Sequence, residues 1–324
     1  MTTPQNVRQP TSQYSYLGIL LTLWGMLSFS SAHAQYSDAV TSFLKKRTDA
    51  FMVVTGYSLT PDVTTGSLSI TDRGGDNPNL QMVSLGGGDR ISESFPLYLE
   101  GTLAVNRYNP TFTDGIGNST ATIPVHWNGI TGTGGVGWDF PITNELRFRP
   151  IANVMLGHVE SDLSLAARYL NNQKSINLQF LNNGRMNAYG AGGSVMLDYE
   201  DYKPERDIDV ELRYTNIPIN TFDSSTAVQG AADSQSASIW ARCRVPIPLT
   251  FFSLPMRSVY ELAHTEFLGD LRGALGFNSL SSVGAGLEVD RKESNPIFSR
   301  VRLVLRYQFG QNVRGTSLSL AASF

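Results

Sequence analysis

Residues 300–309 read RVRLVLRYQF, and this stretch decides the fold. Val301, Leu303 and Leu305 fall on one face of an extended chain, and arginines fall on the other. A membrane-spanning β-strand needs about 9–11 residues of this kind, because one face meets lipid and the other faces a lumen. The segment TSLSLAASF at 316–324 repeats the alternation to the last residue. The pattern predicts strands that cross a membrane.

The same alternation recurs upstream at 145–157, 188–199 and 208–215. A soluble β-sandwich also alternates and is the competing interpretation. However, a sandwich does not normally place several arginines and glutamates on the face opposite the apolar one, strand after strand. The pattern therefore favours a transmembrane barrel over a sandwich.

We predict an all-β fold: an antiparallel up-and-down barrel of about 12 strands with both ends in the periplasm. Short connections are expected at 142–143, 201–206 and 292–298, and intermediate ones at 87–94 and 247–256. Long connections are expected at 109–129, 158–185, 220–234 and 269–280. The predicted strands are 64–71, 79–86, 95–108, 130–141, 144–157, 186–200, 207–219, 235–246, 257–268, 281–291, 299–309 and 314–324.

Composition agrees with this class of protein. Lys and Arg number 25 against 28 Asp and Glu, so the chain is not a basic nucleic-acid binder. Charged residues make up 16%, below the ~25% of a soluble domain. The single cysteine, Cys243, excludes a disulfide framework and is expected to face lipid.

The N-terminus predicts export. Residues 14–29 contain an apolar core of about 13 residues, which suits a signal peptide and is too short to span a bilayer as a helix. Ala32 and Ala34 supply the small residues of a cleavage site. We expect a signal peptide at 1–34, a helix and linker at 35–60, and a barrel at 61–324. Cleavage near Ala34 and an alternating remainder indicate the outer membrane of a Gram-negative bacterium.

A family resemblance follows from the C-terminus and the strand count. Phe324, with alternating apolar residues before it, resembles the signal that the barrel-assembly machinery reads. Twelve strands behind a helix-like segment and the stretch TPDVTTGSLSI at 60–70 resemble the solitary outer-membrane autotransporter barrel. The resemblance implies a non-enzymatic channel, scaffold or surface protein, porin-like in its setting. It also implies outer-membrane lipid, lipopolysaccharide and the assembly machinery as partners.

Residues 37–48, SDAVTSFLKKRT, predict a short helix with Ser37 as its cap and a basic end at Lys45, Lys46 and Arg47. One interpretation is a plug inside the lumen, with the basic end paired to inward carboxylates. The other is a frayed periplasmic tail. The resemblance to translocator barrels favours the plug.

Inward-facing charges form the main candidate site. They either line an ion-selective pore or form a salt-bridge network that fills the lumen. Their mixed signs favour the network. The predicted members are Glu145, Arg147, Arg149, Asp209, Glu211, Arg213, Arg242, Arg244, Glu288, Arg300, Arg302 and Arg306.

The sequence contains one local group of residue types that a hydrolase would need. After the signal peptide the chain holds His126, His158 and His264, and His158 is followed by Ser161 and Asp162. A hydrolase needs a nucleophile, a base and a group that orients the base. We expect no catalytic residue, metal or cofactor, and retain an outer-membrane hydrolase with a loop-end site as the alternative.

Overall fold

The computed structural model describes most of the barrel region of the chain. The chain divides into two compact units, Met1–Lys46 and Arg47–Phe324, and every described residue lies in the second. The described residues are 65–72, 79–92, 94–109, 111–116, 119–124, 127–161, 185–223, 230–273, 276–290, 300–311 and 313–323.

Strands dominate the described residues, and none of these residues forms a helix long and apolar enough to cross a membrane. The strands are β1 (Thr65–Asp72), β2 (Asn79–Arg90), β3 (Leu97–Asn109), β4 (Thr111–Ile116), β5 (Ser119–Pro124), β6 (Trp127–Trp138), β7 (Phe140–Pro141), β8 (Leu146–Ser161), β9 (Arg185–Lys203), β10 (Arg206–Phe222), β11 (Ala231–Phe251), β12 (Leu254–Gly269), β13 (Ser279–Asp290), β14 (Arg300–Gly310) and β15 (Val313–Ser323).

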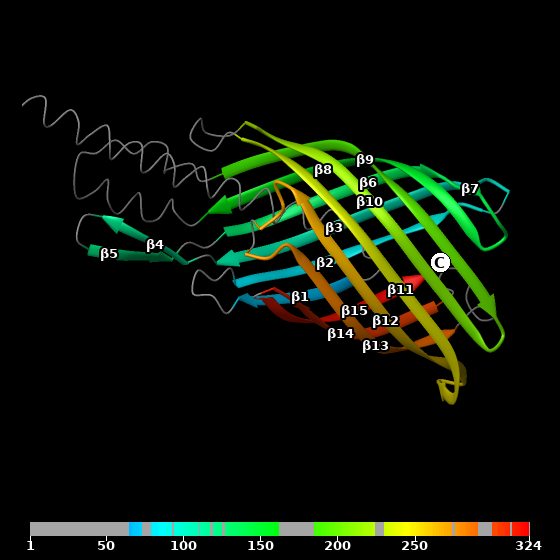
Figure 1. Ribbon diagram of the computed structural model, residues 1–324. Helices are drawn as coiled ribbons and strands as arrows, with labels where there is room; N and C mark the ends of the chain where they lie inside the picture. Colours follow the sequence, from blue (N-terminus) through cyan, green and yellow to red (C-terminus); the bar gives the residue numbers. More distant parts are fainter. Residues whose placement is uncertain are drawn as a thin grey trace, which may run out of the picture. The chain divides into compact units, whose positions relative to one another are not determined.

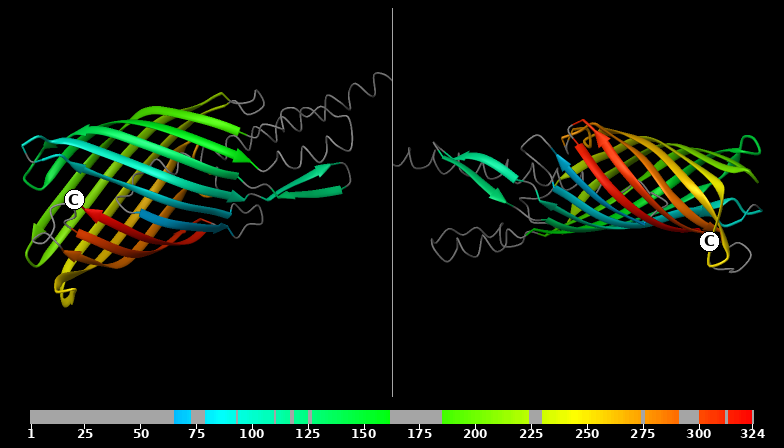
Figure 2. Two further views of the ribbon diagram at one scale, coloured as in Figure 1. Left: turned by 180° about the vertical axis from the view of Figure 1, so that it is seen from behind. Right: turned by 90° about the horizontal axis from the view of Figure 1, so that it is seen from below.

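Twelve of the described strands form one closed antiparallel ring (Figures 1 and 2). Neighbours in the ring are mostly neighbours in sequence, as an up-and-down barrel requires. The ring closes where β1 pairs with β15 and where β6 pairs with both β3 and β8. The short β7 pairs with β8 where β6 ends, and β4 and β5 form a separate hairpin. The predicted all-β antiparallel barrel of about 12 strands is confirmed.

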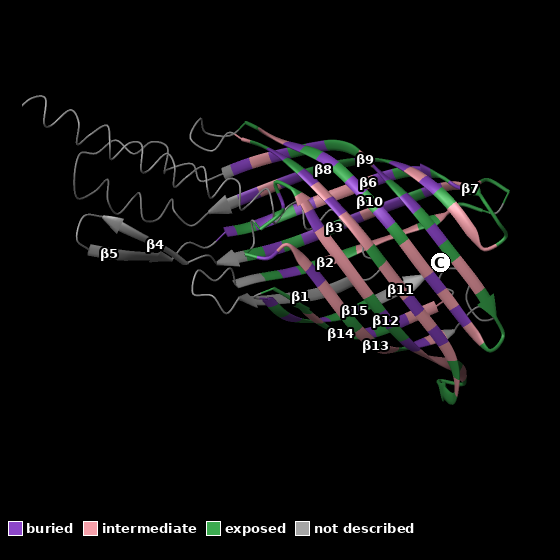
Figure 3. Ribbon diagram, in the orientation of Figure 1, coloured by how far each residue is buried: buried purple, intermediate pink, exposed green. Residues whose placement is uncertain are grey.

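Buried and exposed residues alternate along the strands (Figure 3). The polarity is inverted relative to a soluble protein. Outward apolar side chains are widely exposed, for example Leu156 at 64% and Leu305 at 61%. Inward charged side chains are buried, for example Glu288 at 0% and Arg302 at 2%. An apolar outer wall is stable only against lipid, so this pattern fits a membrane-spanning barrel.

The two rims of the barrel differ. One, the turn rim, carries the connections 142–145, 204–205 and 252–253, together with the start of β1 and the end of β15. The other, the loop rim, carries the β4–β5 hairpin, which occupies most of the predicted long loop 109–129. One connection departs from the expected alternation of lengths: β14 and β15 are joined at the loop rim by 311–312 alone.

The predicted connection 247–256 is largely strand. β11 runs to Phe251 and β12 begins at Leu254, with a register shift between Ile247 and Thr250. The turn between them is made by Phe252 (φ 49°) and Ser253 (φ 65°). Two positive φ angles suit a tight hairpin turn but are normally supplied by Asn or Gly. The tip is apolar, and Phe252 is 85% exposed.

Candidate functional site

The lumen wall has a charged half and an apolar half. On β8, β10 and β12 the inward charges lie nearer the turn rim, and the inward apolar residues lie nearer the loop rim. Buried residues of the apolar half include Met155, Val159, Met186, Ile217, Ile219 and Phe267. The charged half holds the candidate site.

Ion pairs in the charged half join ten arginines to eight carboxylates among the described residues. The arginines are Arg90, Arg147, Arg149, Arg213, Arg242, Arg244, Arg257, Arg300, Arg302 and Arg306. The carboxylates are Glu100, Asp139, Asp198, Glu200, Asp207, Asp209, Glu261 and Glu288. Positive and negative side chains are nearly equal in number, and each of these charges has a partner of opposite sign. This pairing offsets the free-energy cost of burying charged groups.

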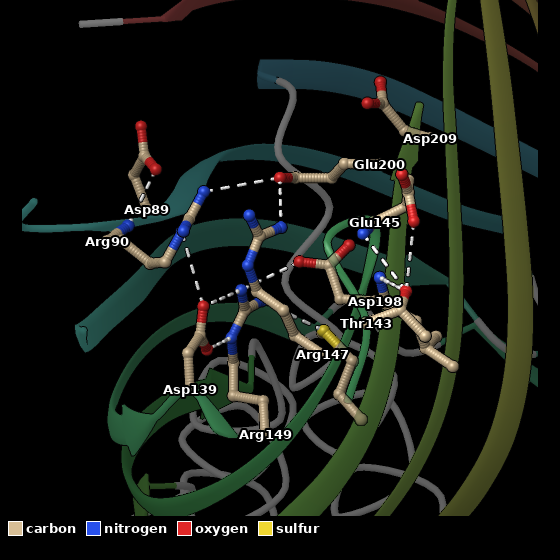
Figure 4. A network of polar contacts seen from close by, with 12 residues as sticks. Asp89, Arg90, Asp139, Thr143, Glu145, Arg147, Arg149, Asp198, Glu200 and Asp209 are labelled. Carbon is tan, nitrogen blue, oxygen red and sulfur yellow. Dashed lines mark hydrogen bonds and ion pairs between the residues drawn. The ribbon is translucent and has the colours of Figure 1, made fainter. Parts of the chain in front are cut away.

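The first cluster of the network lies around Arg149 (Figure 4). Its Nη2 donates to Asp139 Oδ2 at 2.9 Å and to Asp198 Oδ2 at 2.8 Å, and its guanidinium lies 3.9 Å from the centre of the Tyr98 ring. Arg90 links Asp139 (3.3 Å) to Glu200 (3.3 Å). Strands β2, β8 and β9 are thereby connected through their side chains inside the barrel.

The second cluster crosses the lumen. Arg213 on β10 donates two hydrogen bonds of 2.7 Å to the two oxygens of Glu100 on β3. Three strands of the ring, β6, β8 and β9, lie between these two. Asn153 Nδ2 donates to Glu100 at 2.6 Å, so the carboxylate is held from two sides. A bidentate Arg–carboxylate pair is among the strongest polar contacts in proteins.

Because Gly135 on β6 has no side chain, the space beside it is free for the side chain of Glu100. Glu100 and Asn153 are the backbone partners of Gly135 on its two sides. A Cβ atom at Gly135 would lie 2.6 Å from Glu100 Cγ and 2.5 Å from Asn153 Nδ2. The glycine-rich run of β6 therefore permits side chains of β3 to reach over it toward β10.

The third cluster joins β10 to β14. Asp209 accepts from Arg242 Nε at 2.9 Å and pairs with Arg244 at 3.2 Å. Arg244 also lies 3.6 Å from Glu288, which pairs with Arg302 at 3.2 Å. Further along β14, Arg306 pairs with Glu261 at 2.6 Å.

Most of the predicted network residues lie on the inward row of their strands. Glu211 shares the inward row of β10 with Asp209 and Arg213. Glu145 differs: it lies in the turn before β8 and accepts a hydrogen bond from Thr143 Oγ1 at 3.1 Å, because the strand begins two residues later than the predicted 144. Network residues absent from the prediction, such as Arg90, Asp139, Asp207 and Arg257, lie near strand ends, where extending the alternation would have found them.

The predicted residues outside the network are described only in part. His158 Nδ1 lies 2.7 Å from the amide oxygen Oδ1 of Asn187. Cys243 is a free thiol between Arg242 and Arg244. Lys45, Lys46, Arg47, Phe324, His126 and Asp162 lie outside the described residues, as do the cleavage site at Ala34 and the helix 37–48. Among described residues no group of three or more His, Cys, Asp or Glu is placed to hold a metal ion.

The chain was compared with models of known protein families. Residues 117–322 match the model of the "Solitary outer membrane autotransporter beta-barrel domain". The chain belongs to this family. Membership agrees with the resemblance seen in the sequence and places this solitary autotransporter barrel in the bacterial outer membrane. A search of curated protein sequences finds no significant match.

Solved structures similar to this solitary autotransporter barrel include other autotransporter barrels. The β domain of Bordetella BrkA has 12% identity and a TM-score of 0.45, covering 81% of this chain and 97% of its own. The translocator domain of NalP from Neisseria meningitidis has 11% identity and a TM-score of 0.43, covering 79% and 84%. The NanC porin has 10% identity and a TM-score of 0.37, covering 80% and 100%.

Proposed function

We propose that this solitary autotransporter barrel is an outer-membrane scaffold with a closed lumen. It presents its loop rim at the cell surface and does not conduct solutes. Barrels of the outer membrane commonly turn their short connections to the periplasm and their longer ones outward. The proposal therefore assigns the β4–β5 hairpin to the outer surface.

The contact between Glu100 and Arg213 carries this proposal. The pair spans the lumen between β3 and β10, and the two side chains are only 1% and 5% exposed. In an open aqueous channel the charged side chains on the wall would be hydrated. Exclusion from water on this scale supports a lumen that is filled by side chains.

The balance of signs argues against a selective pore. Selective channels use rings of one charge, or of carbonyl groups, at a constriction. Here nearly every inward arginine described has a carboxylate partner, so little net charge is left to attract an ion. The apolar half beyond the network adds a second zone that disfavours passage of hydrated solutes.

A liposome-swelling assay tests the proposal. Liposomes that contain the purified protein should not swell in solutions of small sugars. The variant Glu100→Ala/Arg213→Ala removes the bridge without leaving an unpaired charge and should increase the swelling rate. Lys203→Ala is the matched control, since it removes an exposed ion pair at the turn rim and should change nothing. Swelling by the wild-type protein at the rate of a porin would overturn the proposal.

A further inference from the structure

Three polar side chains meet on β12 and β13, away from the lumen network. His264 Nδ1 lies 2.8 Å from Ser281 Oγ, and His264 Nε2 lies 3.2 Å from Glu266 Oε1. The sheet register aligns them, because His264 and Ser281 are direct backbone partners. The hydroxyl, the imidazole and the carboxylate are thus linked in a row, each within hydrogen-bond distance of the next. Enzymes that catalyse nucleophilic acyl transfer use this arrangement.

The cluster is on the outer wall of the barrel. Inward positions of β12 are taken by Val259, Glu261 and Phe267, so His264 and Glu266 point outward. Their side chains are 44% and 47% exposed, and the next outward residue toward the turn rim is Leu262, at 61%. Polar side chains on a wall that faces lipid are costly, and they are therefore functional candidates.

The depth of the cluster is that of the membrane interface. Ser281 is the backbone partner of Phe309, whose ring stacks on Tyr307 at 6.1 Å. Aromatic residues on the outer wall form girdles at the interface between headgroups and acyl chains. His264, Glu266 and Leu268 are the last three outward residues of β12 before the loop rim. Ester groups of lipids lie at this depth.

A positively charged side chain, that of Arg314, lies two strands away from Ser281 on the outer wall. Phe309 is in turn the partner of Arg314 on β15, which is exposed. Strands lie about 4.8 Å apart, so the backbones of Ser281 and Arg314 are separated by roughly 10 Å. That spacing suits a lipid whose ester reaches the serine while its phosphate meets the guanidinium, a favoured pairing.

We propose that Ser281, His264 and Glu266 form a lipid-facing site that hydrolyses long-chain acyl esters of the outer leaflet. Ser281 is the nucleophile, His264 the general base, and Glu266 the positioning residue that holds the imidazole. The site is on the strand wall, not at a loop end. It goes beyond the closed-scaffold function and does not depend on it.

The reaction balances with water as co-reactant. Ser281 Oγ attacks the ester carbonyl carbon while His264 Nδ1 takes the hydroxyl proton. The acyl C–O bond breaks, and His264 returns the proton to the leaving alcohol. Water then attacks the acyl-serine and gives a proton to His264. The ester to serine breaks, the fatty acid leaves, and the proton returns to Ser281 Oγ.

Release of fatty acid by the purified full-length protein tests the proposal. The probes are mixed micelles of phosphatidylethanolamine in one arm and of lipopolysaccharide in the other, and release in either arm identifies the source of the ester. Ser281→Ala and His264→Ala should each lower the rate on the order of 100-fold or more. Ser282→Ala, the neighbour that faces the lumen, is the matched control and should retain the rate.

Two further measurements keep the test decisive if a variant folds poorly. A fluorophosphonate should label wild-type Ser281, as located by peptide mass analysis. Glu266→Gln should lower kcat with KM unchanged, and Glu266→Asp should restore much of kcat. No fatty acid release in both arms, release that persists in folded Ser281→Ala, or an absence of label on Ser281 would each overturn the proposal. A closed lumen would remain testable by swelling in all these cases.

Discussion

Replacement of Arg213 by Met is expected to destabilise the barrel strongly. The substitution keeps most of the side-chain length but removes two hydrogen bonds of 2.7 Å to Glu100. Glu100, at 1% side-chain exposure, is left as a buried anion. Breaking a buried ion pair by removing one partner costs about 3–5 kcal/mol. The surviving bond from Asn153 to Glu100 favours the lower end of this range.

The double variant Glu100→Gln/Arg213→Met removes both charges and should recover much of the loss. The free energy of unfolding is measured in urea, with the folded fraction read from heat-modifiable migration on gels. Lys203→Ala breaks an ion pair in which Lys203 is 48% exposed and should cost about 0–1 kcal/mol. An Arg213→Met loss no larger than that of Lys203→Ala, or additive losses in the double variant, would refute the cross-lumen bridge.

Three further predictions concern the space beside Gly135, the geometry of the β11–β12 turn and the N-terminal segment. Gly135→Ala should cost about 1–3 kcal/mol in the same urea assay, because its Cβ would crowd Glu100, whereas Gly132→Ala meets nothing within 4 Å and should be close to neutral. Phe252→Asn/Ser253→Gly should raise stability by about 1 kcal/mol or more, since both residues have positive φ; an unchanged melting temperature would count against strain there. Residues 37–48 stay a predicted plug, and deletion of residues 35–48 should lower the melting temperature if they occupy the lumen.

The strands could be predicted from the sequence because alternation is a local property. Most residues of 300–309 have a polarity that assigns them to lipid or lumen without knowledge of their neighbours in space. Val304 is an exception, because it is apolar but is buried on the inward row. Strand ends are harder: β11 extends to Phe251 although PIPLTFF contains no charged residue and has two prolines, because backbone pairing with β12 continues. Backbone hydrogen bonds in lipid need partners, whatever the side chains are.

Contacts across the sheet could not be predicted in the same way. Glu100 and Arg213 are 113 positions apart, and their meeting depends on the ring order and on the missing side chain at Gly135. His264 and Ser281 are 17 positions apart and meet only because of the β12–β13 register. The alternation along a strand predicts that a charged side chain points inward. Its ion-pair partner depends on the order and register of the strands in the ring.

Single-channel recording in planar bilayers tests the central claim, a lumen closed by paired side chains, most directly. The wild-type protein is expected to give no steady conductance of porin size. Glu100→Ala/Arg213→Ala, which opens the bridge between β3 and β10, is expected to give resolved channel events. A large, steady wild-type conductance that the double variant leaves unchanged would contradict the account.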